Sequence, residues 1–427
     1  LSDSTIYLAY DTIAHLLQKV DPKKVDDKLF DYVMLGKGKK PNIPGIDQMR
    51  KEFDYWYPFD FNSSGKDLIQ NHLTFALFNH TAIFPEKKWP AGYGLNGWVM
   101  VDGNKMSKSL GNMISLRDMT SIYGADASRM TILAGGEDMD DPNWDTNFAT
   151  SMVSKLSQVM VHAQEEYNKG RTDKLKPIDQ WALSKTNELI RDATKAMEET
   201  MYRTAIQRIF FDMQQMVRWY KRRTHDHPHK KVMNNIIESQ ILMLAPFTPH
   251  LCEELWERLG KNKKGTDFIS FASWPKIDKK AINAEADQGE MLVEQTLKDV
   301  ESVLKLAKVE SPKKISFFVS PLWKYDFYGK LSKAMTKTRH PGELIKAMMK
   351  TPLKKHGQII TKMIPRLART GLPAKLLDQK KETKVLEHAR DFFKEIYGCT
   401  VEIVVAEKSK EKKAQQASPG KVAILVE

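Results

Sequence analysis

The spacing at which apolar residues recur changes twice along this chain of 427 residues, and the change limits the folds that the chain can adopt. Residues 1–147 mix short apolar runs with helical stretches and turn residues, which is typical of an α/β layer. Residues 148–280 keep a helical period, which indicates an all-α helical bundle. Residues 281–406 alternate helical stripes with period-2 strands, which indicates a small α+β domain. Residues 407–420 are too polar to bury a core and predict a flexible linker, and residues 421–427 return as an apolar tail strand.

The composition agrees with several domains and restricts the kinds of partner. A chain of this length exceeds what one hydrophobic core usually supports. Its 41% hydrophobic and 28% charged residues are typical of a globular protein, and no apolar run approaches the roughly 20 residues of a bilayer span. The net charge of +13 predicts a polyanionic partner such as nucleic acid, with a merely solubilising basic surface as the alternative.

Two further features concern the setting of the protein. Cys252 and Cys399 lie far apart and form neither a zinc knuckle nor the disulfide framework of a secreted protein, which favours the cytoplasm. The first residues, LSDSTIYLAYDT, lack the basic and apolar parts of a signal peptide and do not begin with Met. The sequence is therefore compatible with a fragment of a longer protein.

A basic, hydroxyl-rich loop follows a short apolar run that Asp102-Gly103 closes. The loop reads Lys105-Met106-Ser107-Lys108-Ser109. Two ammonium groups and two hydroxyls within five residues can bind a triphosphate, and Gly103 and Gly111 on either side let the loop open and close. Positive charge on a mobile loop suits the stabilisation of pyrophosphate as it leaves. The alternative is a solvated basic turn between a strand and a helix.

A second element lies forty residues upstream and reads SSGKDLIQNHL from Ser63. Gly65 allows close approach of the backbone, the following helix offers free N–H groups, and Asp67 can accept hydrogen bonds from the two hydroxyls of a ribose. His72 follows on the same helical stretch. Taken alone, the pattern is better explained by an ordinary helix N-cap at Ser64 or Asp67.

Longer stretches carry a family resemblance. The basic loop matches the KMSKS signature of class I aminoacyl-tRNA synthetases, and the upstream element matches the segment that holds their adenosine. SDSTIYLAY at 2–10, the block at 53–85 and GADASRMTILAG at 124–135 resemble leucyl-tRNA synthetases of the archaeal and eukaryotic cytosolic type. LMLAPFTPHLCEELWERLG at 242–260 resembles the helical anticodon domain of the Leu, Ile, Val and Met enzymes.

This resemblance implies a partial Rossmann-like class I catalytic fold before the bundle, and a reaction. Leucine would be activated with ATP and Mg²⁺ and transferred to tRNA-Leu in the cytoplasm, without protein-bound zinc. The resemblance assigns catalysis to Lys105 and Lys108, ATP binding to Gly65, Asp67, Met106, Ser107 and Ser109, and a leucine pocket to Ser2, Asp3, Ser4 and Tyr7. For the last four residues, a buried strand edge is the alternative.

The chain also departs from the family pattern. It contains no HIGH motif and no editing domain, and His15 lies within a helical stretch that does not replace that motif. Asp11 stands where the family has an aromatic residue, and Gln70 where Pro is usual. We therefore expect an N-terminal synthetase half or subunit to complete the catalytic site, and the chain alone not to charge tRNA.

Two basic runs are candidate tRNA contacts. In the bundle they are Arg218, Lys221, Arg222 and Arg223, interleaved with aromatic residues, and a solvated helix end is the alternative. In the C-terminal domain they are Lys354, Lys355, Lys362, Arg366 and Arg369, followed by further lysines up to Lys384. The resemblance also places tRNA contact at the tail, residues 423–427, where completion of a sheet edge is the alternative.

Two other functions remain open at this stage. A synthetase fragment without the HIGH motif could act as a non-catalytic tRNA-binding module. A related class I ligase for Ile, Val or Met would share the KMSKS loop and the bundle.

Overall fold

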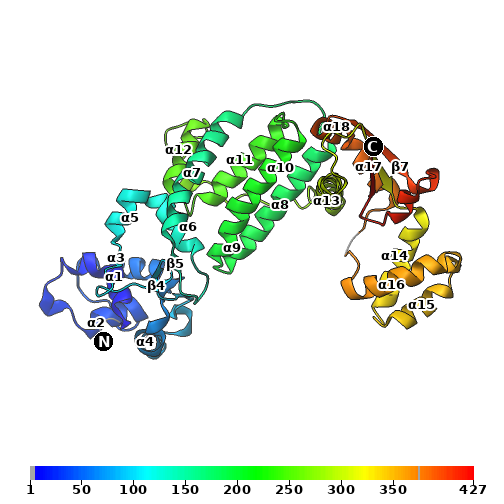
Figure 1. The fold of residues 1–427 in the computed structure, drawn as a ribbon. Helices are drawn as coiled ribbons and strands as arrows, with labels where there is room; N and C mark the ends of the chain where they lie inside the picture. Colours follow the sequence, from blue (N-terminus) through cyan, green and yellow to red (C-terminus); the bar gives the residue numbers. More distant parts are fainter. Residues whose placement is uncertain (1–4, 374–375) are drawn as a thin grey trace. The chain divides into compact units, whose positions relative to one another are not determined.

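The computed structural model describes residues 5–373 and 376–427, and the chain divides into two compact units (Figure 1). The first unit comprises residues 1–165, 190–212 and 240–275, and the second comprises residues 166–189, 213–239 and 276–427. The division falls inside two long helices, α8 (Pro177–Glu198) and α11 (Lys230–Leu244). Among the described residues, no helix combines the length and the apolar character that crossing a membrane would take.

The first unit begins with short helices that share one apolar core. They are α1 (Tyr7–Leu17), α2 (Asp27–Phe30), the π-helical turn η3 (Asp31–Leu35) and α3 (Ile46–Trp56). Ile46, Met49 and Phe53 recur at spacings of three and four residues, so they lie on one face of α3. They are buried together with Ile13 of α1 and Leu29 of α2.

Two small sheets follow in the first unit. Strand β1 (Asn62–Gly65) pairs in parallel with β2 (Tyr93–Asn96), and the chain between them forms η4 (Lys66–Leu68), η5 (Ile69–Leu73), α4 (Thr74–Ile83) and η6 (Glu86–Lys88). In the other sheet, β3 (Met100–Val101) lies between antiparallel β4 (Asn104–Lys105) and parallel β5 (Asn143–Trp144). Helices α5 (Leu116–Tyr123) and α6 (Ala125–Ala134) precede β5. Val101, Met119, Trp144 and Ala149 form the core under this sheet.

Between β5 and β6, every named element of the described chain is helical, as the apolar period predicts. Besides α8 and α11 these are α7 (Thr146–Glu166), α9 (Tyr202–Ile206), η7 (Gln207–Asp212), α10 (Met213–Arg223), α12 (Pro249–Arg258), η8 (Ile269–Phe271) and α13 (Ala284–Ala307). The expected stripe on α7 is buried at Met152, Leu156 and Val159. The mixed sheet-and-helix class expected from the sequence is confirmed, with helix predominating.

A three-stranded sheet organises the C-terminal part of the second unit. Its order is β7-β6-β8, with β6 (Lys314–Val319) parallel to β7 (Thr400–Val405) and antiparallel to β8 (Ala423–Val426). Helices α13, α17 (Gln379–His388) and α18 (Arg390–Tyr397) pack against it, and Phe317 and Phe393 meet in that core.

A helical module is inserted between β6 and α17. It consists of α14 (Leu322–Met335), α15 (Pro341–Met349), η9 (Pro352–His356) and α16 (Gly357–Thr370), drawn in yellow to orange in Figure 1. The module has an apolar core of its own, which includes Phe327, Leu331, Leu344, Ile360 and Ile364.

The segment expected to be a flexible linker, residues 407–420, is instead packed against the sheet. It forms part of η10 (Ala406–Lys408) and the whole of η11 (Lys412–Gln416), and Ala414 and Ala417 are fully buried beside Phe318 of β6. The ammonium of Lys324, itself buried on α14, donates to the carbonyl oxygens of Gln415 (2.7 Å) and Ala417 (2.6 Å). These hydrogen bonds and the small buried side chains hold residues 407–420, which we call the strap, in place despite their polar composition.

Glu382 of α17 closes the other end of the strap. Its two oxygens accept hydrogen bonds from the amide of Gly420 (2.7 Å) and the hydroxyl of Tyr325 (2.6 Å), and the side chain is almost completely buried. Burial raises the pKa of Glu382 to about 7 and lowers the pKa of Lys324 to about 8. Burial thus shifts both groups toward their neutral forms: Glu382 keeps its proton up to about pH 7, and Lys324 loses its proton from about pH 8.

The burial of Glu382 predicts that the stability of the strap depends on pH. Between pH 4.5 and 7 the folded protein holds a proton on Glu382 that the unfolded chain has lost, so the strap loses stability as pH rises through this window. Glu382→Gln keeps an acceptor for Gly420 and removes the charge. At pH 8 the amides of residues 415–420 should be protected from hydrogen exchange by about 2–3 kcal/mol more in Glu382→Gln than in the wild-type protein. At pH 5 this difference should be much smaller. The exposed Glu387→Gln on the same helix is the control, and equal protection of wild type and Glu382→Gln at both pH values would contradict the prediction.

Candidate functional site

The KMSKS loop starts from a β-hairpin. Between β3 and β4, Asp102 and Gly103 have φ values of 47° and 78°. Two-residue hairpin turns that fit the twist of their strands need positive φ at both positions, and Asp-Gly is one of the sequences that meet this need. The local sequence thus fixes where Lys105, the last residue of β4, leaves the sheet.

Side chains tie this hairpin to its neighbours. The carboxylate of Asp102 accepts hydrogen bonds from the amide (2.9 Å) and the hydroxyl (3.0 Å) of Thr146, the first residue of α7. The amide of Gly103 donates to Asn143 Oδ1 of β5 at 2.8 Å. A carboxylate at a helix N-terminus is stabilised by the free amides there, so the hairpin is anchored at two points.

The loop also closes on itself. Asn112 Nδ2 donates to the carbonyl of Lys105 at 3.1 Å, and Asn112 Oδ1 accepts from the amide of Ser107 at 2.9 Å. The hydroxyls of Ser107 and Ser109 lie 2.8 Å apart, and Gly111 has a φ of 65°. The hydroxyl of Ser107 also accepts the amide of Leu110 at 3.2 Å, so the loop keeps a defined shape.

The two lysines of the loop differ in their surroundings. Lys105 Nζ lies 5.8 Å from the centre of the Trp98 ring. Lys108 is exposed, and its ammonium has no hydrogen bond or ion pair with any residue of the described chain. Met106 packs against the core that contains Val101 and Trp144. The loop is thus held by Met106 and presents the charge of Lys108 to solvent.

The upstream element turns sharply where β1 ends. A Cβ atom at Gly65 would lie 2.5 Å from Asp67 Oδ1, so the carboxylate of Asp67 occupies the space that any side chain at position 65 would need. Asp67 is exposed, and its carboxylate has no hydrogen-bond or ion-pair partner among the described residues. No side chain caps η4, so the ordinary N-cap by Ser64 or Asp67 is not formed.

Lys66 and Asp141 connect the upstream element with the KMSKS hairpin, and sequence reasoning missed this pair. Lys66 Nζ lies 2.6 Å from Asp141 Oδ1, and the same oxygen accepts the amide of Trp98 at 2.7 Å. The Lys66 ammonium, followed by the Trp98 amide, lowers the pKa of Asp141. Because Trp98 also lies against Lys105, the two motifs share one supporting contact network.

In chemical terms, the arrangement offers an unpaired carboxylate at Asp67 and an unpaired ammonium at Lys108 on a hydroxyl-rich loop. The carboxylate suits hydrogen-bond donors such as ribose hydroxyls, and the ammonium suits phosphate oxygens. Among the described residues, no group of three or more His, Cys, Asp or Glu side chains is arranged to hold a metal ion.

Comparison with known domain families places these motifs. Residues 48–137 match the family described as tRNA synthetases class I (C) catalytic domain, and this range includes both motifs. Residues 179–317 match the anticodon-binding domain of tRNA ligase.

Comparison over the whole chain finds similar leucine–tRNA ligases. The leucine–tRNA ligases of Pyrococcus abyssi and Aeropyrum pernix are each 36% identical to this chain over its whole length. The chain is a homologue of archaeal leucine–tRNA ligases. It spans 45% and 46% of the length of these two relatives. A solved LeuRS–tRNA–LeuAMS ternary complex from Agrobacterium radiobacter is 21% identical over 61% of this chain and 33% of that chain, with a TM-score of 0.47.

The resemblance to leucine–tRNA ligases also singles out residues near the start of the chain. Ser2, Asp3 and Ser4 lie outside the described residues. Tyr7 is half exposed at the start of α1. In the 53–85 block, His80 is fully buried, accepts the Tyr57 hydroxyl at 3.0 Å and donates to the Ala76 carbonyl at 2.7 Å, so it has a structural role.

The part matched to the catalytic domain exposes an apolar surface. Helix α4 is apolar on most sides, and Phe75, Leu77 and Phe78 are exposed, Phe78 to 69%. The neighbouring sheet has only two strands, β1 and β2, and they are parallel. Parallel sheets are normally buried on both faces, and a helix that is apolar all round is normally a core helix. The surface therefore resembles the interior of a protein more than a solvated face.

Two of the four cations in the basic run of the bundle form ion pairs within the protein. Lys221 Nζ is 2.5 Å from a carboxylate oxygen of Glu166, and Arg223 Nε is 2.5 Å from one of Glu290. Tyr220, expected to support RNA contact, is fully buried. Arg218 and Arg222 remain exposed at the surface.

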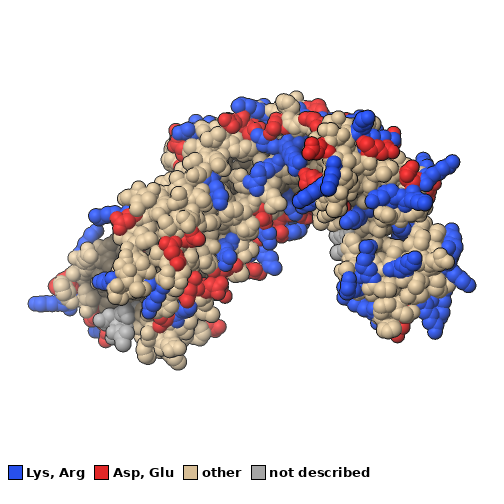
Figure 2. All heavy atoms as spheres, in the orientation of Figure 1, with Lys and Arg blue, Asp and Glu red and all other residues tan. Residues whose placement is uncertain are grey.

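The basic run of the helical module is exposed. Lys354, Lys355, Lys362, Arg366 and Arg369 are all exposed, and no ion pair involves them within the described residues. Residues 322–370 contain twelve Lys and Arg against two Asp and Glu. Figure 2 shows blue side chains predominating over this module with few red ones among them.

The tail completes the sheet edge, which is the alternative considered above. Ala423 and Ile424 are buried in β8, and the carbonyl of Glu427 accepts the amides of Lys313 (2.7 Å) and Lys314 (3.0 Å). These residues are committed to the sheet by backbone hydrogen bonds.

Proposed function

We propose that this chain supplies the KMSKS loop and the tRNA-binding domains of a leucine–tRNA ligase. In this reaction the leucine carboxylate attacks the α-phosphorus of ATP, the bond to pyrophosphate breaks, and leucine then passes from the adenylate to the terminal ribose of tRNA-Leu. The observation that carries the proposal is the unpaired Lys108 ammonium on a loop whose base is fixed by Asp102 and Asn112. The 36% identity to named leucine–tRNA ligases favours this amino acid over Ile, Val or Met.

Each motif has a separate task in this reaction. Lys108, with Lys105 behind it, neutralises the charge that develops on the leaving pyrophosphate, while Ser107 and Ser109 donate hydrogen bonds to phosphate oxygens. Gly65 and Asp67 receive the ribose of ATP. Mg²⁺ enters with ATP as part of the substrate and is bound chiefly through the phosphates. Catalysis in such a site comes mostly from positioning and charge stabilisation.

The remainder of the catalytic site comes from further polypeptide in this proposal. The apolar surface of α4 and the two-stranded parallel sheet are where that polypeptide docks. The missing part is an N-terminal half, either continuous with this chain or a separate subunit, and the assembly works in the cytoplasm.

Leucine-dependent ATP–pyrophosphate exchange tests the proposal. The chain alone should show no exchange and no leucylation of tRNA, whereas a mixture with the N-terminal half of the Pyrococcus abyssi enzyme should show both. Robust leucylation by the pure chain would contradict the need for a partner. An inactive mixture in which both parts are folded and associated would contradict the ligase assignment.

A second function, a non-catalytic tRNA-binding module, is favoured by the charge of residues 322–370. It predicts tight, salt-sensitive tRNA binding without exchange activity in any mixture.

A further inference from the structure

A cavity of about 810 Å³ lies within the second unit. Its walls come from the start of α8, the end of α10 with the turn after it, the start of α13, and α17. Its volume is that of a small-molecule or cofactor pocket. Neither motif of the proposed catalytic site contributes to it.

The interior of the cavity is partly apolar and aromatic. Ile178 and Trp181 of α8 line one side, and Val385 of α17 and Phe392 line another. Gly289 brings α13 close to α17, because a Cβ atom there would lie 2.9 Å from Val385 Cγ2. The Trp181 ring is half buried, and its indole N–H has no hydrogen-bond partner among the described residues.

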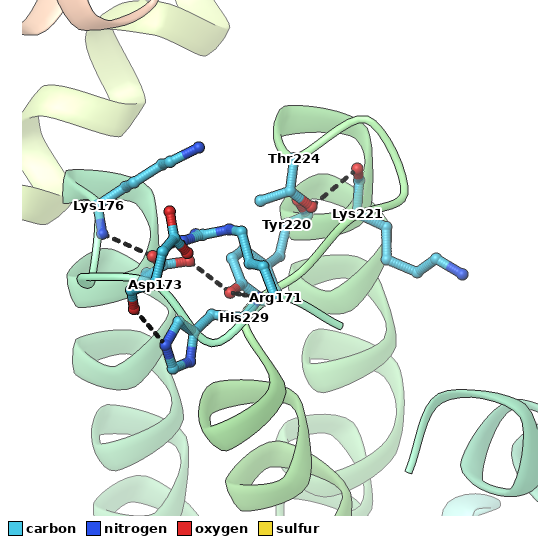
Figure 3. Close-up of polar contacts among 8 residues, drawn as sticks. Arg171, Asp173, Lys176, Tyr220, Lys221, Thr224 and His229 are labelled. Atoms are coloured by element: carbon cyan, nitrogen blue, oxygen red, sulfur yellow. Dashed lines mark hydrogen bonds and ion pairs between the residues drawn. The ribbon is translucent and has the colours of Figure 1, made fainter. Parts of the chain in front are cut away.

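A buried network fixes one wall. Asp179 is fully buried and accepts hydrogen bonds from Arg171, from the Lys176 amide (2.6 Å) and from the Tyr220 hydroxyl (2.6 Å). Figure 3 shows Arg171 beside Asp173, with His229 bonded to the Asp173 carbonyl. Since each group is bonded to at least one other, Arg171 is held at the wall in one conformation.

The opposite wall is equally fixed. The side chains of Arg223 and Glu290 are 7% and 9% exposed and form an ion pair at 2.5 Å, and Glu290 Oε1 also accepts the Trp219 indole N–H at 2.8 Å. The Arg223 guanidinium lies 4.5 Å from the centre of the Phe392 ring. Both walls are therefore pre-formed, as binding pockets usually are.

Uncompensated positive charge remains at the cavity. Lys176 and Lys384 line it, both are exposed, and neither ammonium has an ion pair within the described residues. In Figure 3 the Lys176 side chain extends away from the network, to which only its backbone amide is bonded. His227 and His388 add further nitrogen donors to the same lining.

We propose that this cavity binds one nucleotide of single-stranded RNA, with the base inside against the accessible ring of Trp181 and the adjoining phosphate at Lys176 and Lys384. The proposal rests on the proposed function, because that function brings RNA to this chain. A free cation pair beside an aromatic interior is the combination that single-stranded nucleic acid requires, since bases stack on aromatic rings and phosphates need positive charge. An isolated anion would use the cations but would leave the aromatic interior empty.

The test uses the whole chain and a short mixed-sequence RNA that carries thiouridine for photo-crosslinking. Crosslinks should form in peptides that contain Trp181 or Phe392. Lys176→Glu with Lys384→Glu should lower crosslinking and RNA affinity at least tenfold and reduce the salt dependence. Trp181→Leu, which keeps an apolar side chain but removes the flat ring, should lower affinity about tenfold. Lys231→Glu with Lys305→Glu is the matched control, because both lysines are exposed in the same unit, belong to neither basic run and do not line the cavity.

Thermal unfolding establishes that each variant folds. The results of the binding experiments then support or contradict the proposal. Crosslinks confined to other regions, or an equal loss in the matched control, overturn the proposal. Displacement of the RNA by AMP alone at the same nucleotide concentration identifies a free nucleotide as the ligand and overturns the RNA assignment. The cavity variants should retain full ATP–pyrophosphate exchange in the mixture with the N-terminal half, so the nucleotide pocket and the ligase assignment can fail independently.

Discussion

Replacing Lys108 by Ala should lower leucine-dependent ATP–pyrophosphate exchange by about two to three orders of magnitude in the mixture with an N-terminal half. The ammonium of Lys108 has no partner among the described residues, so its removal disturbs no contact of the folded chain. Its charge is needed where negative charge develops on pyrophosphate. The loss should therefore appear in kcat, with the KM for leucine little changed.

Two further variants make this result specific. Lys108→Arg keeps the positive charge and should retain more activity than Lys108→Ala. Lys87→Ala removes another exposed lysine of the same unit and should have no effect. If Lys87→Ala and Lys108→Ala lowered exchange equally, general charge and not the loop would be responsible.

Reversing three charges of the helical module should weaken tRNA binding on the order of 100-fold. The change is Lys354→Glu, Lys355→Glu and Lys362→Glu in one variant. All three lysines are exposed, and no ion pair within the described part of the chain involves them, so each is free to neutralise a phosphate. Binding measured across a series of salt concentrations should show a slope smaller by about three.

The control for this variant changes the same charge elsewhere. Lys23, Lys24 and Lys28 are exposed in the first unit, and their triple change to Glu should leave the slope unaltered. Equal weakening by both triple variants would mean that tRNA responds to net charge alone, and the module would lose its assigned role.

The sequence predicted those elements whose conformation is determined by residues close together in the chain. Asp102-Gly103 specifies its turn through two adjacent residues, and the stripe on α7 follows from the helical period. Contacts between distant residues leave no such pattern. Lys66 and Asp141 are 75 positions apart, and nothing near either residue indicates the other.

The errors have a common physical origin. The strap at 407–420 looks like a linker because it is polar, yet Ala414 and Ala417 bury fully, and small side chains add little apolar character to a sequence. Nothing in the sequence pattern singles out Lys324 and Glu382, two charged residues that hold the strap from buried positions. Tyr220 looked available for RNA because it stands among basic residues, yet its hydroxyl bonds a buried carboxylate.

The helical module has an evolutionary consequence. Because α14 to α16 have a core of their own and lie between the end of β6 and the start of α17, the sheet order β7-β6-β8 does not depend on the exposed residues of these helices, which exclude Lys324 and Tyr325 at the strap. Substitutions there can accumulate without altering the strand register that the rest of the domain requires. A lineage could thus adjust how strongly it holds its RNA by varying one insertion, while selection on the sheet and on the KMSKS hairpin remains unchanged.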